Sequence, residues 1–116
     1  MSAAAGQLQD GLGQSVWTEL VWAWRFRKLR RQSVAWLAPS EADHAAWRAD
    51  GTVEPFGDHL VAVARIDGRR AWILENDWFG WPDPPQYAFF AFDAEGAIWA
   101  ATNFNHWPER WTLPES

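Results

Sequence analysis

The 116-residue chain has no cysteine, one methionine and one tyrosine. Without cysteine it forms no disulfide framework, no thiolate nucleophile and no thiolate metal site. Long apolar runs are also missing: none approaches the roughly 20 residues that cross a bilayer, so no membrane span is expected. The N-terminus lacks the basic segment and following apolar segment of a secretion signal. By elimination, a cytoplasmic location is expected.

Motifs for catalysis and cofactor binding are scarce too. The chain has no glycine-rich phosphate loop and no Gly-x-Ser-x-Gly turn, and its five serines stand near expected helix caps or the chain ends. The three histidines, His44, His59 and His106, are not at the spacing of metal ligands. We therefore expect no metal site and no cofactor.

Tryptophan is abundant, with 11 residues beside 7 phenylalanines. Each large ring buries roughly 150–250 Å², so eleven are more than a small core easily hides. Some should lie at a pocket, a partner surface or a mobile edge. Residues 1–13 are small and polar, which predicts a frayed N-terminus. The length and the 48% hydrophobic content predict one folded domain over the remaining residues, 14–116, which we expect to be α+β.

The net charge of −5 is unevenly distributed. Residues 1–37 carry five cations and two carboxylates, which gives +3, and residues 38–116 carry five cations and thirteen carboxylates, which gives −8. The basic run over 25–31 suits nucleic acid or an anionic membrane, or a solvated helix face that docks partly on the protein's own carboxylates. Because the acidic remainder repels polyanions, we favour the second interpretation and expect no nucleic-acid partner.

Two helices are expected before the strands. Residues 15–38 have helical periodicity from a Ser15 N-cap to Pro39. Their apolar stripe comprises Trp22, Phe26, Leu29 and Trp36 or Leu37, widened by Trp17, Leu20, Val21 and Trp24. Ser40 with Asp43 forms a capping-box pattern, which predicts a second helix over 41–50 that ends at Gly51.

The rest reads as two β-hairpins. Residues 59–66 and 69–76 flank an Asp67-Gly68 turn, which pairs Val63 with Trp72 and Val61 with Leu74. Residues 86–93 and 97–104 flank a turn with Gly96 at its left-handed position, and 105–111 form a tail. Pairing Asp93 with Ala97 places Phe90, Phe92 and Ile98 on one side, and Tyr87, Phe89 and Trp99 on the other.

Both faces of these hairpins are apolar, whereas a sheet with one wet face alternates apolar and polar residues. Two helices can cover one face. Tails, sheet curvature or a second molecule must cover the other. The expected fold is α+β, with two N-terminal helices packed on a curved four-stranded antiparallel sheet.

That arrangement, together with the segment Phe92-Asp-Ala-Glu-Gly-Ala-Ile98, resembles the nuclear-transport-factor-2-like cone fold. The resemblance covers about the last half of the chain. It implies a short cone-like fold as the alternative architecture. It also implies the activities of that superfamily, which are those of small isomerases, dehydratases or ligand binders. No functional residue is carried over from the resemblance.

The polar residues gather at two expected strand ends. Glu75, Asp77 and His106 are the candidate catalytic residues, because a His–carboxylate pair beside aromatic walls can transfer protons. The candidate binding residues are Trp78, Trp81, Tyr87, Trp99, Asn103 and Trp107. The alternative is that these polar groups cap turns or pair with arginine.

Three functions fit these observations. The first is a non-catalytic interaction domain that holds a protein partner or its own copy through the aromatic loop over 78–85 and a sheet face. The second is a cone-shaped binder of an apolar small molecule, or an isomerase- or dehydratase-like enzyme. Stacking of exposed tryptophans on sugar rings is a weaker third. Because the first predicts an uncovered apolar face, it predicts self-association.

Overall fold

In the described part of the chain, two α-helices and a four-stranded antiparallel sheet form an α+β fold, as the sequence predicts. The structure is a computed structural model, and it describes residues 15–77 and 86–114. The elements, in chain order, are α2 (Val16–Leu29), β1 (Val34–Ala35), α3 (Glu41–Ala49), the 3-10 turn η1 (Glu54–Phe56), β2 (His59–Ile66), β3 (Arg69–Glu75), β4 (Tyr87–Phe92), β5 (Ile98–Phe104) and β6 (Trp111–Thr112). In the described part of the chain, no helix is long and apolar enough to cross a membrane.

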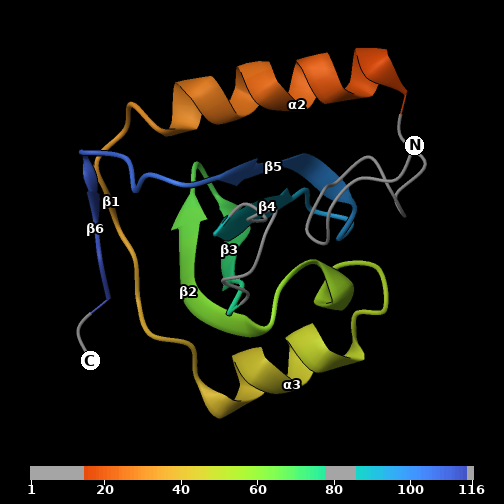
Figure 1. The fold of residues 1–116 in the computed structure, drawn as a ribbon, viewed down its shortest axis with the longest axis vertical. Coiled ribbons are helices and arrows are strands. Elements are labelled where there is room, and N and C mark those ends of the chain that lie inside the picture. The colour runs from red at the N-terminus through yellow and green to blue at the C-terminus, as the bar shows by residue number, and fades with distance from the viewer. Residues whose placement is uncertain (1–14, 78–85, 115–116) are drawn as a thin grey trace.

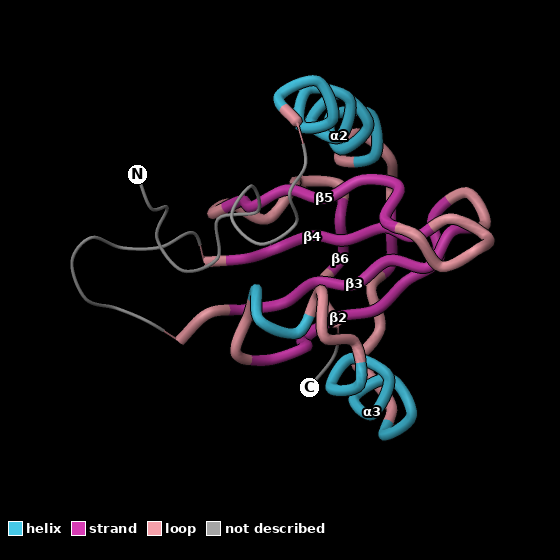
Figure 2. The backbone as a smooth tube through the Cα atoms, turned by 90° about the vertical axis from the view of Figure 1, so that its right-hand side faces the viewer, coloured by secondary structure: helices cyan, strands magenta, loops and turns pink. Residues whose placement is uncertain are grey.

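The sheet has the order β2-β3-β4-β5, so each strand pairs with its neighbours in sequence. In Figure 1, α2 lies along β5 and α3 lies at the opposite end of the molecule. Figure 2 shows the strands stacked in their order, with α2 beyond β5 and α3 beyond β2. The two hairpins therefore form one sheet between the helices.

The first helix is shorter than predicted. Ser15 is its N-cap, and its side chain accepts a hydrogen bond from the Thr18 amide, but the helix ends at Leu29 instead of continuing to residue 38. Beyond a turn, Val34 and Trp36 are buried while their neighbours are exposed. That alternation has the period of a strand. The chain accordingly changes from helix to strand, and β1 begins at Val34.

β1 pairs in parallel with β6, with Val34 opposite Trp111. The segment expected to be only a tail therefore contains a short strand. Beyond β1 the same segment pairs with a different strand, because Leu37 exchanges two backbone hydrogen bonds of 2.9 Å with Val63 of β2 in an isolated antiparallel bridge. Contacts distant in sequence thus tie the chain between the helices to β6 and to β2.

The second helix agrees with its prediction. α3 begins after Ser40, whose hydroxyl accepts from the Asp43 amide while the Asp43 carboxylate accepts from the Ser40 amide. This reciprocal pair is the capping box expected from the sequence. The helix ends at Ala49, one residue before the predicted end, and buries Trp47.

Both hairpin turns form as predicted, and both ladders shift register away from the turn. Asp67 and Gly68 have φ of 54° and 80°, and Gly96 has φ of 86°. Val63 pairs with Trp72, but a register shift at Val61 puts Leu60, not Val61, opposite Leu74.

The second hairpin shifts in the same way. Phe92 pairs with Ile98, and the next pair is Ala91 with Ala100, so Trp99 is the extra residue of a bulge. A bulge adds one unpaired residue and reverses the faces beyond it. The register predicted from the turn alone is therefore wrong past Trp99.

The chain's own aromatic residues cover both faces of the central strands. Phe89 and Phe90 are adjacent on β4, so their side chains point to opposite faces. Phe89 contacts Phe26 of α2 and Trp111 of β6, with ring centroids 5.1 and 5.8 Å away. Phe90 contacts Phe56 of η1 at 5.9 Å. Residues 71–74 and 88–92 are all buried, so the sheet face expected to hold a partner is not exposed.

Candidate functional site

The two polar segments predicted to converge lie on the same rim of the sheet. Tyr87, the first residue of β4, pairs with Glu75 of β3 on one side and with Phe104 of β5 on the other. Two interstrand spacings separate β3 from β5, roughly 10 Å. Gln86 connects them: its amide donates to Oδ1 of Asn105 at 2.8 Å, and its Nε2 donates to Oε2 of Glu75 at 3.2 Å.

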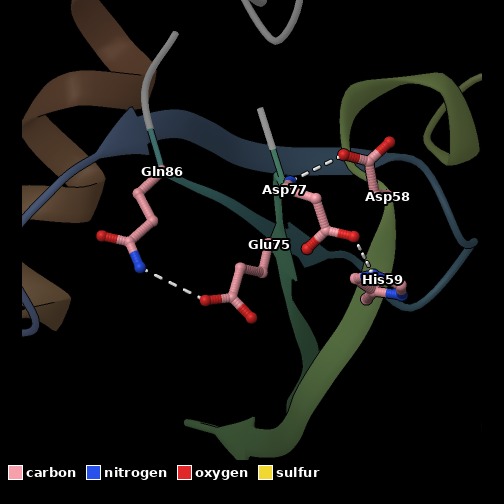
Figure 3. A network of polar contacts seen from close by, with 5 residues as sticks. All are labelled: Asp58, His59, Glu75, Asp77 and Gln86. Carbon is pink, nitrogen blue, oxygen red and sulfur yellow. Dashed lines mark hydrogen bonds and ion pairs between the residues drawn. The ribbon is translucent and has the colours of Figure 1, made fainter. Parts of the chain in front are cut away.

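A second set of contacts joins β2 to the same rim, as Figure 3 shows. The Asp77 amide donates to Oδ2 of Asp58 at 2.7 Å, and Nε2 of His59 lies 2.5 Å from Oδ2 of Asp77. The Asp58 amide donates to the Glu75 carbonyl at 2.8 Å. The start of β2 and the end of β3 thus form one polar cluster, here called the rim cluster: Asp58, His59, Glu75, Asp77 and Gln86.

His59 was not among the predicted site residues. The sequence could have identified His59, because a two-residue turn at Asp67-Gly68 places His59 opposite the end of β3. In the structure, the partner of His59 across the two strands is Glu75. The His–carboxylate pair of the rim therefore uses His59. His106 is exposed and forms no side-chain hydrogen bond or ion pair with any other described residue.

The electrostatics of the rim are negative. The rim cluster contains three carboxylates, Asp58, Glu75 and Asp77, and one imidazole, His59, which contacts Asp77. Burial raises the pKa of the Tyr87 hydroxyl above its usual value, and the negative charge of Glu75 raises it further. Such a rim attracts cations. Among the described residues, no group of three or more His, Asp or Glu could hold a metal ion.

The other predicted binding residues mostly pack within the protein. Nε1 of Trp107 donates to the Trp111 carbonyl at 3.0 Å, and its ring lies edge-on to Trp36 and Tyr87. Nδ2 of Asn103 donates to the Tyr87 carbonyl at 3.4 Å. These contacts attach β5 and the segment before β6 to the start of β4.

Trp99, the bulged residue, lies between two cations. The guanidinium carbon of Arg25 lies 4.7 Å from its ring centroid and that of Arg69 lies 3.9 Å away. Nη1 of Arg25 also donates to the Trp99 carbonyl at 2.6 Å. This clamp attaches α2 to β5. Trp78 and Trp81 lie outside the described residues.

A different surface carries exposed aromatic groups. α2 buries Trp22, Phe26 and Leu29 against the sheet, as predicted. Its opposite face, however, exposes four apolar side chains, and the sequence pattern assigns three of them, Trp17, Leu20 and Trp24, to a widened buried stripe. These four residues, here called the α2 stripe, are Val16, Trp17, Leu20 and Trp24. Trp17 is 74% exposed and Trp24 is 59% exposed.

Comparison with protein-family models, curated proteins and solved structures gave no match to this chain. The resemblance to the nuclear-transport-factor-2-like fold stays a prediction. The contacts of the chain itself are therefore the basis for assigning a function.

Proposed function

We propose that this chain is a non-catalytic interaction domain that binds a second copy of itself through the α2 stripe. The observation that carries the proposal is that the first half of α2, residues 16–24, has apolar side chains on two opposite sides of the helix, one buried and one exposed. A helix that is hydrophobic all round is normally buried, and contiguous exposed apolar patches mark interaction sites. Tryptophan is also the residue type most enriched among energetically dominant interface residues.

The spacing of the stripe suits antiparallel pairing with an identical helix. Leu20 lies in the middle, with Val16 and Trp17 one turn before it and Trp24 one turn after it. A two-fold axis through Leu20 places Leu20 against Leu20 of the second copy. Trp24 of each copy then packs against Val16 and Trp17 of the other. Such a self-complementary patch is the requirement for a symmetric dimer.

The charges of α2 favour an antiparallel arrangement of the two helices over a parallel one. Residues 16–24 contain one charged residue, Glu19, whereas Arg25, Arg27 and Lys28 follow in the second half of the helix. Antiparallel pairing about Leu20 places the two cationic halves at opposite ends of the contact. A parallel pairing brings like charges together, which is unfavourable.

Sedimentation velocity at micromolar concentration tests the proposal. The parent chain should sediment as a dimer, and a Trp24→Ser variant should shift toward monomer because it loses one of the two large rings at each end of the contact. Leu37→Ser is the matched control, since Leu37 is an equally exposed apolar residue, at 63%, far from the α2 stripe in sequence. It should remain dimeric. A monomeric parent chain, or equal dissociation of both variants, would refute the proposal.

One observation favours a second candidate function, in which the rim cluster binds or transforms a small molecule. His59 contacts Asp77 beside Glu75, and a His–carboxylate pair is a usable acid–base unit. Thermal-shift screening of a small-molecule panel against the parent and the His59→Ala variant tests it. A compound that stabilises the parent alone supports this function, and equal stabilisation of both places binding elsewhere.

A further inference from the structure

A basic cavity lies at the C-terminal end of α2. Its volume is about 460 Å³, within the range of small-molecule sites. It is lined by four arginines, Arg27, Arg30, Arg31 and Arg110, together with Glu109 and Trp107. Four guanidinium groups and one carboxylate give a formal charge of +3, in a chain whose net charge is −5.

The backbone around this cavity is held by hydrogen bonds between its two segments. Nε1 of Trp111 donates to the carbonyl of Leu29, the last residue of α2, at 3.3 Å. The Val34 amide donates to the Arg110 carbonyl at 3.2 Å. The helix end and the segment before β6 therefore keep a fixed spacing, and Arg110 lines the same cavity as Arg27 of α2 and the two arginines that follow the helix.

The four guanidinium groups have no partner within residues 15–77 and 86–114, since none of their side chains forms a hydrogen bond, an ion pair or a ring contact there. Other arginines differ: Arg25 binds the Trp99 carbonyl, Arg65 binds the Gly68 carbonyl at 3.0 Å, and Arg70 lies over Phe92. The docking on the protein's own carboxylates predicted for the basic run is thus not found for these residues.

The helix dipole alone does not explain this cluster. Cations in the last turn of a helix interact favourably with its negative end, which accounts for Arg27. Arg110, however, comes from a segment about 80 residues further along the chain, and the fold brings it to the same cavity. Guanidinium groups that converge from two segments form a site for an anion, because their planar forks match phosphate oxygens.

We propose that this four-arginine cavity binds a small soluble phosphate ester or polyphosphate. Several exposed guanidinium groups around an open surface cavity fit a compact ligand with more than one negative charge. A long polyanion is disfavoured, because Glu109 lines the cavity and residues 38–116 carry a charge of −8. The α2 stripe contributes no residue to the cavity lining, so this site is independent of the proposed self-association.

Isothermal titration of the full chain with inorganic pyrophosphate, in low-salt buffer without phosphate, tests the proposal. The parent should bind, and the double variant Arg30→Gln/Arg110→Gln should bind at least about tenfold more weakly, the value of one charge-assisted contact. The matched control is Arg48→Gln/Arg65→Gln, which removes the same charge from exposed positions outside the cavity. Its affinity should equal that of the parent, and circular dichroism checks that both variants fold.

Three results would overturn the proposal. The first is the absence of pyrophosphate binding to the parent. The second is an equal loss of affinity in the cavity variant and its control, which would indicate only a general charge effect. The third is binding of duplex DNA, or of vesicles that contain a phosphorylated phosphatidylinositol, without binding of soluble pyrophosphate.

Discussion

Glu75 and Tyr87 lie directly opposite each other at the ends of β3 and β4, and the carboxylate of Glu75 raises the pKa of the Tyr87 hydroxyl. Burial is the larger cause of that rise. Gln86 contacts both side chains, since its Nε2 lies 3.2 Å from Oε2 of Glu75 and 3.2 Å from the Tyr87 hydroxyl. The pKa of the Tyr87 hydroxyl therefore reports on this part of the rim, and it can be measured without overlap because Tyr87 is the only tyrosine in the chain.

We predict that Tyr87 ionises above the usual tyrosine pKa of about 10. Spectrophotometric titration of phenolate absorbance reports this residue alone. The Glu75→Gln variant removes the negative charge, so the pKa of Tyr87 should fall toward the usual value without reaching it, because burial still disfavours the anion. An unchanged pKa in Glu75→Gln would contradict the contact between the two residues.

The same shift predicts how stability depends on pH. The folded-state pKa of Tyr87 is raised, so its contribution to the free energy of unfolding is fully present below the unfolded-state pKa of about 10. The contribution is lost as the pH rises from there through the folded-state pKa. Denaturant unfolding across this pH range should show that the free energy of unfolding falls more steeply with pH in the parent than in Tyr87→Phe. Equal slopes in the two proteins would rule the linkage out.

We predict that Gly57→Ala destabilises the fold through contact with β3. A Cβ at position 57 would meet Cβ of Leu74, and Leu74 is fully buried and has no room to move. The free energy of unfolding should fall by about 1–3 kcal/mol, as for other overpacked sites. At Gly51 an added Cβ has no neighbour within 4 Å, so Gly51→Ala is the control. Denaturant unfolding that gives equal effects at both positions would contradict the packing.

We predict that tryptophans of the core and of the α2 stripe differ sharply in their effect on monomer stability. Trp72 is buried and stacks edge-on to Phe92 at 5.0 Å, so Trp72→Ala should cost about 3–5 kcal/mol. Trp17→Ala should change the free energy of unfolding by less than about 0.5 kcal/mol, because its ring is exposed. Chemical denaturation at concentrations that keep the chain monomeric makes the comparison, and a large loss at Trp17 would show that it is a core residue.

Local signals in the sequence predict most of the fold. The Ser15 and Ser40 caps, the Asp67-Gly68 turn and Gly96 each act over a few residues, and each forms as expected. The extent of the first helix does not follow from such signals. Trp36 fits the predicted helical stripe, but the pairing of Val34 with Trp111, 77 positions further along the chain, makes the segment a strand. Tertiary contacts override a local preference there.

The bulges limit what could be predicted about the site. The bulged residues, Val61 and Trp99, are not glycines or other residue types that mark a bulge. The turns alone therefore predict the wrong sheet face for side chains beyond these two positions. The shared rim of Glu75 and Asn105, by contrast, follows from the order of two consecutive hairpins. The α2 stripe and the cavity at Arg110 depend on which helix face meets the sheet and on the position of β6, and neither is encoded locally.

Cross-linking at Leu20 tests the central claim, self-association through the α2 stripe, most directly. Because the chain has no cysteine, a Leu20→Cys variant has a single thiol, and a two-fold axis through that position brings two thiols close enough to bond. Leu37→Cys is the control at a similar exposure, 63% against 58%. Under mild oxidation at micromolar concentration, non-reducing electrophoresis should show a covalent dimer for Leu20→Cys and a monomer for Leu37→Cys. Equal cross-linking of both variants, or none at Leu20→Cys, would contradict the account.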